Sequence, residues 1–251
     1  MQYQLAFSYY VGQKPNGWTN LLLLTICLSI PAVGPIVILG YQAEVTEWLL
    51  RDPDRRRYPD FNFDRFTRYL ERGIWPFVIH LVGTLIGLPV IMLACIAAFS
   101  VAAAANALPL GILAAIGVVL AGSILFTALL SPLTFHAEVA NRFDLGGGFR
   151  FTLDFWKRVG GAAVVAYFVS TIMGMAVCFV GLLVCFFGLY PAASITGMAS
   201  QHLMTQLYVL YLDRGGEEIV KTERRRRRYE DEDADEDDGG YDIEDDRRRR
   251  D

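Results

Sequence analysis

Residues 73–137 read "GIWPFVIHLVGTLIGLPVIMLACIAAFSVAAAANALPLGILAAIGVVLAGSILFTALLSPLTFHA", and these 65 residues contain no Asp, Glu, Lys or Arg. A second stretch without these residues, 159–212, is 54 residues long. Because a helix needs about 20 apolar residues to cross the bilayer core, each stretch has room for two crossings joined by a turn. We therefore expect an all-α integral membrane protein, a helical bundle, rather than a soluble helical domain.

A third stretch without charged residues, 15–43, has 29 residues, which is long for one helix and short for two. Pro31 and Pro35 flank Gly34 near its centre, and such a sequence favours a turn. We expect residues 19–50 to form a short, Pro-broken hairpin, which gives three membrane hairpins and six helices. A single span kinked at the prolines, which gives five crossings, is the alternative.

The positive charges indicate which loops face the cytoplasm. Loop 51–72 holds seven Arg, and loop 138–158 holds four Arg or Lys. Positively charged loops remain cytoplasmic, so both loops and the C-terminal tail are expected on that side of the cell (inner) membrane. The N-terminus then lies on the same side if residues 19–50 form a hairpin.

Two sequence motifs recur in the same order. Ala43-Glu44-Val45 is repeated as Ala137-Glu138-Val139, and Arg-Phe-Thr at 65–67 is repeated at 150–152. Each second motif leads into an uncharged run, which indicates an internal duplication. We expect an N-terminal segment (1–14), a membrane domain (15–212) with repeats 43–135 and 137–212, and a tail (213–251).

Short amphipathic helices are expected where each repeat enters the membrane. Aromatic and aliphatic residues alternate there with cations, as in helices that lie flat at a membrane interface. An ordinary juxtamembrane loop is the alternative. The apolar residues expected at the interface are Phe66, Tyr69 and Leu70 in the first repeat, and Phe151, Phe155 and Trp156 in the second.

Small residues at regular spacing predict where membrane helices pack closely. Gly83 and Gly87 form a GxxxG motif, and a second stripe recurs every four residues: Ala162, Ala166, Ser170, Gly174 and Cys178. Packing within one chain is the favoured interpretation, and homo-oligomer formation is the alternative. The last helix is expected to have one polar side that faces protein and lines a possible cavity: Ser194, Gln201, His202, Thr205 and Tyr208.

Signatures of catalysis are missing from the sequence. It contains no HExxH, P-loop, GxGxxG after a strand, or GxSxG motif, and the predicted spans hold no interior carboxylate, Lys or Arg. The four cysteines lie in apolar segments without metal-ligand spacing and are interpreted as packing residues. We expect no enzyme activity, no catalytic or metal site and no cofactor.

The tail has few apolar residues and is expected to be disordered. Its arginines at 224–228 follow the last predicted span, where a basic cluster can bind anionic lipid. Neutralisation by the adjacent acidic block 230–238 is the alternative. Nucleic-acid binding is not expected, because from Asp213 onward 17 acidic residues outnumber 11 basic ones. The residues for which lipid contact is predicted are Arg224, Arg225, Arg226, Arg227 and Arg228.

Three segments of the chain resemble an uncharacterised prokaryotic family of polytopic membrane proteins, catalogued as a domain of unknown function. They are "IPAVGPIVILGYQAEV", "YPDFNFDRFTRYLERGIWPFVI" and "QHLMTQLYVLYLDRGG", and the resemblance covers about residues 15–215. The matching positions are Pro31, Gly40, Tyr41, Pro59, Phe63, Gly73, Pro76, Gln206 and Tyr208. The resemblance implies a multi-pass membrane protein and no particular reaction, ligand or functional residue.

Two functions are compatible with these features. The favoured one is a non-enzymatic membrane protein that organises or regulates partners or lipids, with membrane lipids and a protein partner or second copy as its contacts. The alternative is a small permease or lipid-handling carrier. A cavity lined by Gln201, His202 and Thr205 would favour the carrier, whereas a solid bundle would favour the organiser.

Overall fold

All regular elements in the described part of the chain are helices, so the predicted all-α architecture is confirmed. The computed structural model describes residues 3–4, 6–7, 16–51, 58–105, 107–184 and 188–220. The elements are α2 (Gly17–Leu28), α3 (Val33–Arg51), the 3₁₀ turn η1 (Phe63–Arg65), α4 (Phe66–Ala104), α5 (Leu108–Ala140), α6 (Leu145–Leu183) and α7 (Leu189–Asp213).

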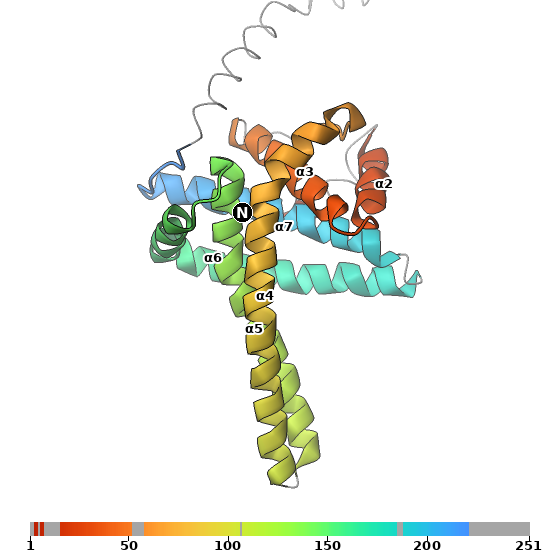
Figure 1. Ribbon diagram of the computed structural model, residues 1–251, viewed down its shortest axis with the longest axis vertical. Coiled ribbons are helices and arrows are strands. Elements are labelled where there is room, and N and C mark those ends of the chain that lie inside the picture. The colour runs from red at the N-terminus through yellow and green to blue at the C-terminus, as the bar shows by residue number, and fades with distance from the viewer. Residues whose placement is uncertain are drawn as a thin grey trace, which may run out of the picture. The chain divides into compact units, whose positions relative to one another are not determined.

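Helices α4 and α5 form a long hairpin that projects from the other helices (Figure 1). We call the part of this hairpin from Gly73 to Ala137 the stalk. The other helices, together with the two ends of the hairpin outside that range, are called the head. In the most apolar 18-residue windows of α4 and α5, only 0% and 6% of the residues are buried. Leu85, Leu93 and Val101 are among the exposed side chains, at 66%, 66% and 72%. Soluble proteins rarely expose a continuous apolar surface of this kind.

Among the described residues, three elements are long and apolar enough to cross a bilayer: Phe63–Ala104, Leu108–Ala140 and Leu145–Leu183. Their mean hydropathies over those windows are 2.5, 2.5 and 2.2. With the exposed stalk, they make the chain a membrane protein. Helix α2 has only 12 residues, about 18 Å of helix, which is shorter than the hydrocarbon core.

The segment with the two prolines forms a hairpin of two helices, as predicted. Helix α2 ends at Leu28, and α3 begins at Val33 after a turn in which Ala32 is left-handed, with φ of 62°. Asn16 and Asn20 at the start of α2 both donate hydrogen bonds to Asp60, over 2.7 and 3.2 Å. Because Asp60 lies in the connection that follows α3, the start of α2 and the end of α3 lie at the same end of the hairpin.

Helices α3 and α4 cross with their backbones in contact at two glycines. A Cβ atom on Gly40 would lie 1.9 Å from the carbonyl oxygen of Tyr69, and one on Gly73 would lie 1.8 Å from that of Ile36. Tyr41 and Tyr69 are completely buried beside this crossing. The Tyr41 hydroxyl donates a 2.8 Å hydrogen bond to the carbonyl of Pro59, which holds the α3–α4 connection against α3.

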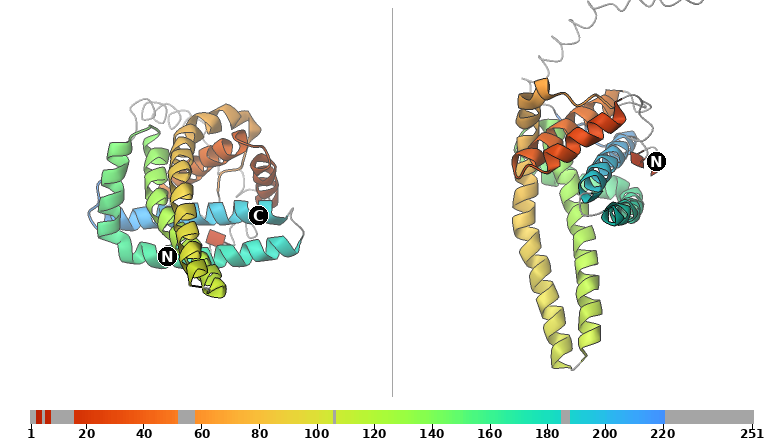
Figure 2. Two further views of the ribbon diagram at one scale, coloured as in Figure 1. Left: turned by 60° about the horizontal axis from the view of Figure 1, so that its bottom comes forward. Right: turned by 90° about the vertical axis from the view of Figure 1, so that its right-hand side faces the viewer.

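The two predicted amphipathic helices are the first turns of α4 and α6, not separate elements. Both long helices change direction along their length (Figures 1 and 2). Helix α4 contains Pro76 and Pro89, and α6 contains the pair Gly160–Gly161, residue types at which helices bend. Asp144 caps α6 by accepting a 2.8 Å hydrogen bond from the Gly147 N–H. That bond and Arg142 hold the pKa of Asp144 below its ordinary value.

The prediction that the apolar residues of these turns face the membrane interface was wrong for Tyr69, Phe151 and Phe155. Tyr69 and Phe155 are fully buried, and Phe151 is 7% exposed. Phe151 and Phe155 pack against Tyr211 of α7, with ring centroids 5.3 and 6.1 Å apart. Their burial leaves a different apolar face of α6 exposed, formed by Leu145, Phe149 and Leu153.

Helix α7 lies inside the head and contacts α2, α3, α5 and α6 (Figure 2). Both its expected polar side and its apolar side are buried, including Ala199, Leu203 and Leu207. The chain that follows it also packs on the head, although the tail was expected to begin at Asp213. Ile219 is 5% exposed, and its N–H donates a 3.0 Å hydrogen bond to the Tyr208 hydroxyl.

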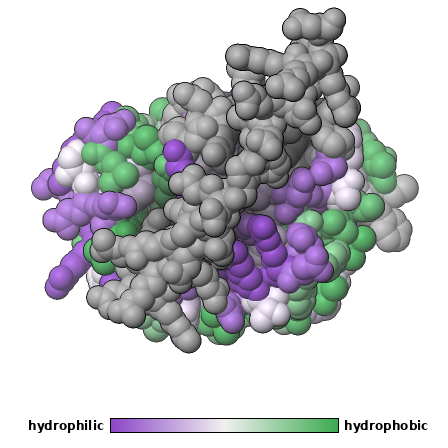
Figure 3. All heavy atoms as spheres, turned by 90° about the horizontal axis from the view of Figure 1, so that it is seen from above, coloured by the Kyte–Doolittle hydropathy of each residue, from purple (hydrophilic) through white to green (hydrophobic). Residues whose placement is uncertain are grey.

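The end of the molecule away from the stalk tip carries hydrophilic patches beside hydrophobic ones (Figure 3). The stalk, by contrast, has no Asp, Glu, Lys or Arg from Gly73 to Ala137. A stalk without charged residues is suited to the hydrocarbon of a membrane.

Candidate functional site

A buried polar cluster joins three helices in the head. The Gln201 amide nitrogen of α7 lies 2.7 Å from the Thr46 hydroxyl of α3, and 2.8 and 2.9 Å from the two carboxylate oxygens of Glu138 on α5. Glu138 is 2% exposed and Thr46 is 1% exposed. Burying a carboxylate is costly unless it is hydrogen-bonded, and the Gln201 amide supplies such a bond to Glu138.

The glutamates of the two predicted repeats are both buried but lie at different places in their helices. Glu44 within α3 is 3% exposed and pairs with Arg65, the residue before α4. Glu47, one turn further, pairs with the buried Arg72 over 2.9 Å. The acidic residue of the first repeat therefore binds the following helix, whereas Glu138 of the second repeat binds α7.

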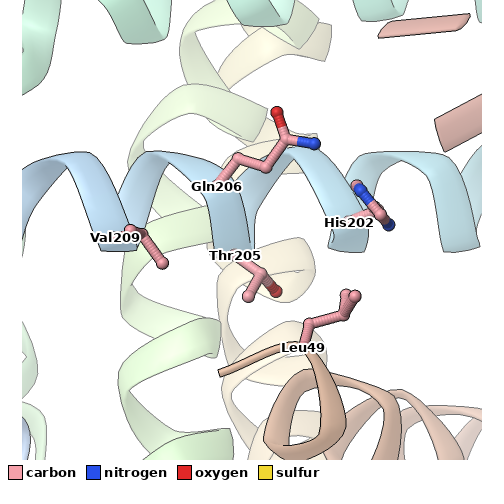
Figure 4. A pocket seen from close by; sticks show the side chains of 5 residues that line it. All are labelled: Leu49, His202, Thr205, Gln206 and Val209. Carbon is pink, nitrogen blue, oxygen red and sulfur yellow. The ribbon is translucent and has the colours of Figure 1, made fainter. Parts of the chain in front are cut away.

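His202 is buried on α7, at 1% exposure, and its Nδ1 lies 2.8 Å from the Tyr58 hydroxyl. Thr205 donates a 3.0 Å hydrogen bond to the carbonyl of Gln201 in its own helix. A small pocket of about 120 Å³ lies beside these two residues, and Leu49, Gln206 and Val209 complete its lining. Gln206 points away from Leu49 in the close-up view (Figure 4).

The residues predicted to line one polar cavity are divided by the structure. His202 and Thr205 line the small pocket, but Gln201 is held by Glu138 and Thr46. Tyr208 receives the N–H of Ile219. The buried Ser194 hydroxyl has no hydrogen-bond partner among the described residues. The geometry thus does not form one cavity from all five.

A second, larger pocket lies among α5, α6 and α7 and has a volume of about 230 Å³. Seven of its lining residues carry hydroxyl groups, and the others are apolar: Ala166, Gly174, Leu203, Met204 and Leu207. We call it the hydroxyl pocket. Its hydroxyl residues are Thr127, Ser131, Tyr167, Ser170, Thr171, Thr196 and Ser200.

The predicted helix-packing residues lie at helix contacts to different extents. Gly83 and Gly87 of α4 face Leu130 and Phe126 of α5, and Cβ atoms there would approach these side chains to 2.6 and 2.3 Å. In α6, Ala166, Ser170 and Gly174 are buried, and Gly174 faces Thr196 of α7. Ala162 and Cys178 are only partly buried.

The predicted lipid-binding arginines and the cysteines form no site among the described residues. Arg224 to Arg228 lie outside the described residues. Within the described part of the chain, no group of three or more His, Cys, Asp or Glu residues is placed to hold a metal ion. Cys27, Cys95 and Cys178 are free thiols.

The hydroxyl pocket was not among the predicted sites, although the sequence contains a signal for it. Hydroxyl residues stand four apart within apolar runs of three different helices, and this spacing places both members on one helix face. The three pairs are Thr127 with Ser131, Tyr167 with Thr171, and Thr196 with Ser200. Tyr58 and Thr46 were also missed, because only the tertiary fold brings them to α7.

Comparisons with known proteins identify a family but no activity. No curated protein matches the chain, and no solved structure matches it either. The profile of one family, described as "Protein of unknown function (DUF4013)", matches residues 23–189, which is more than half of the 251 residues. The chain therefore belongs to the DUF4013 family, in agreement with the resemblance found in its sequence.

Proposed function

We propose that this membrane protein is a non-enzymatic organiser or regulator of membrane partners or lipids. The observation that supports it best is the state of the polar side of α7. Gln201 lies between Glu138 and Thr46, and His202 is held by Tyr58, so these groups are joined to other helices. Groups that are bound in this way stabilise a bundle and do not offer a polar path across it.

The arrangement of the apolar helices also supports this proposal. The stalk gives the protein a large lipid-exposed surface, while the head presents charged residues such as Arg142 and Lys157 at its exposed surface. A protein with these two surfaces can contact both the hydrocarbon and the lipid headgroups. We infer that loops 51–72 and 138–158 and the tail are cytoplasmic.

A small permease or lipid-handling carrier is the second candidate function. The observation that favours it is the hydroxyl pocket, whose volume of about 230 Å³ admits a small polar group. The internal repeat is compatible with this function too. A carrier would require this pocket to open in turn to the two sides of the membrane.

Reconstitution of the full chain into liposomes separates the two functions. For an organiser, the rates of fluorescent-lipid scrambling and of small-solute efflux are expected to equal those of protein-free liposomes.

Gln201→Leu is expected to lower the thermal stability of the protein, because it removes the amide that donates to the buried Glu138 carboxylate.

The matched control for Gln201→Leu lies outside the buried polar cluster. Ser100→Leu provides the control, because Ser100 is exposed on the stalk and donates its hydrogen bond to the carbonyl of Ile96 in its own helix. Protein-dependent flux that Ser100→Leu preserves would contradict the organiser and favour the carrier.

A further inference from the structure

The hydroxyl pocket lies among segments that are otherwise apolar. Thr127 and Ser131 belong to the uncharged run of α5, and Tyr167 to Gly174 belong to that of α6. Thr127 and Ser200 are exposed residues, so the pocket opens to the surface of the protein. Because α5 and α6 are candidate membrane spans, this opening faces a region in which lipid tails offer no hydrogen bonds.

Several hydroxyls of the pocket already have partners within the protein. Ser170 and Ser200 hydroxyls lie 3.2 Å apart across α6 and α7, and Thr171 donates to the carbonyl of Tyr167 over 2.7 Å. Each hydroxyl oxygen has one donor and two acceptor positions, so these bonds leave further capacity toward the pocket. The Thr196 hydroxyl is buried and has no hydrogen-bond partner among the described residues.

The lining contains no charged residue. A phosphate group in this pocket would therefore lose its hydration without gaining a cation, which is unfavourable. A neutral group with several hydroxyls fits the lining better, because each of its hydroxyls can both donate and accept a hydrogen bond. Leu203, Met204 and Leu207 form an apolar wall of the pocket, against which the C–H groups of such a headgroup can pack.

We propose that the hydroxyl pocket binds the neutral, polyhydroxyl headgroup of a membrane lipid, a glycerol or sugar group without phosphate. This inference rests on the lipid part of the proposed function and names the lipid class. The volume of about 230 Å³ corresponds to several water molecules of about 30 Å³ each, which matches a headgroup rather than a whole lipid. The acyl chains then lie outside the pocket, against the apolar surfaces of α5 and α6.

Native mass spectrometry of the full chain, released from nanodiscs, tests this inference. The nanodiscs contain phosphatidylglycerol, phosphatidylethanolamine and a monoglucosyl diacylglycerol, and any detergent used is free of sugar. The protein is expected to retain the glucolipid in preference to both phospholipids. The double variant Ser131→Ala with Ser200→Ala is expected to reduce glucolipid retention about tenfold, because two hydroxyl partners are removed.

Ser100→Ala is the matched control, since it removes a hydroxyl from the stalk outside the pocket and is expected to change nothing. Ser200→Phe, which fills the mouth of the pocket, is expected to reduce retention as the double variant does. Equal retention by wild type and both pocket variants, or equal retention of phospholipid and glucolipid, would overturn the inference.

A competition arm distinguishes a lipid from a soluble source of the same chemistry. Free glucose at millimolar concentration is expected to leave the glucolipid bound, because it lacks the apolar contacts. Displacement by free glucose would overturn the lipid source and assign the pocket to a soluble polyol. Phospholipid adducts that persist in every variant would leave the organiser proposal standing even where the pocket inference fails.

Discussion

Gly40 and Gly73 have only a hydrogen atom where any other residue has its Cβ carbon. The two glycines belong to helices that touch backbone to backbone, since a Cβ on Gly73 would also lie 2.8 Å from the backbone nitrogen of Gly40. Helices in membranes gain much of their association from such close approach. This contact explains in physical terms why both positions are among those that carry the family resemblance.

Gly40→Ala is expected to destabilise the protein by about 3 kcal/mol, the upper end of the range for overpacking, because the clash is with the Tyr69 backbone and not with a movable side chain. The measurement is thermal unfolding in detergent. Gly117→Ala in α5 is the control, since a Cβ there meets nothing within 4 Å. That control is expected to stabilise α5 by up to about 1 kcal/mol through helix propensity. Similar losses for both variants would refute the backbone contact.

Ala32 shows a different residue-scale effect, one that the sequence alone does not reveal. The composition around Pro31, Gly34 and Pro35 predicted a turn, and glycine is the residue expected to take a left-handed conformation there. In the structure the left-handed residue is Ala32, while Gly34 lies in α3 against the carbonyl of Cys27. Gly34 is thus used for close packing of α2 on α3, and the turn takes its strain at the alanine.

At the scale of elements, the lengths of the uncharged runs predicted the helices well. The α4–α5 hairpin, α6 and the break in residues 19–50 follow from charge-free runs and prolines. The inward-facing side of the first turns of α6 was not predictable, because apolar residues occur on two sides of those turns. In α6 the choice between burying Phe151 with Phe155 and burying Phe149 with Leu153 is made by contact with Tyr211, which is distant in sequence.

The candidate site was predicted less well for a related reason. A single helix can be assigned a polar side from its sequence, and α7 does place Gln201, His202 and Thr205 among buried groups. Whether those groups line a cavity or bind one another depends on side chains of other helices, here Glu138, Thr46 and Tyr58. Hydrogen bonds between distant segments have no periodic signal in one sequence, so the partners of α7 required the fold.

Gly174→Leu tests the packing of α6 on α7. A Cβ at Gly174 already lies 2.8 Å from the methyl group of Thr196, so a leucine would separate the two helices or displace that side chain. We expect a loss of about 2–3 kcal/mol, measured as a lower midpoint of thermal unfolding in detergent. Ala176→Leu is the matched control, because Ala176 is exposed on the same helix and the added side chain meets lipid. Equal unfolding midpoints for the two variants would contradict this contact.

At the scale of the whole molecule, the hairpin of α2 and α3 determines the side of the N-terminus. Asn16 and Asn20 bind Asp60, and the Phe61 N–H donates a 3.1 Å hydrogen bond to Asn20. These contacts tie the start of α2 to the connection between α3 and α4. If the Arg-rich loop 51–72 is cytoplasmic, the N-terminus is cytoplasmic as well, and the stalk tip between α4 and α5 is on the opposite side.

Cysteine labelling tests this topology in a chain whose four native cysteines are replaced. Ala105→Cys at the exposed stalk tip is expected to react with an impermeant maleimide in intact cells. Gln13→Cys and Glu218→Cys are expected to react only after the membrane is opened. For Gln13→Cys, the reason is that the α2–α3 hairpin returns to the side of the membrane from which it starts. For Glu218→Cys, the reason is that α6 and α7 together return the chain to the side of loop 138–158. Labelling of Gln13→Cys in intact cells, with Glu218→Cys still protected, would mean that residues 19–50 cross the bilayer once despite the break between α2 and α3. Labelling of Glu218→Cys in intact cells, together with protection of Ala105→Cys, would instead show that the whole protein has the inverted orientation. That result would contradict the charge rule on which the predicted orientation rests.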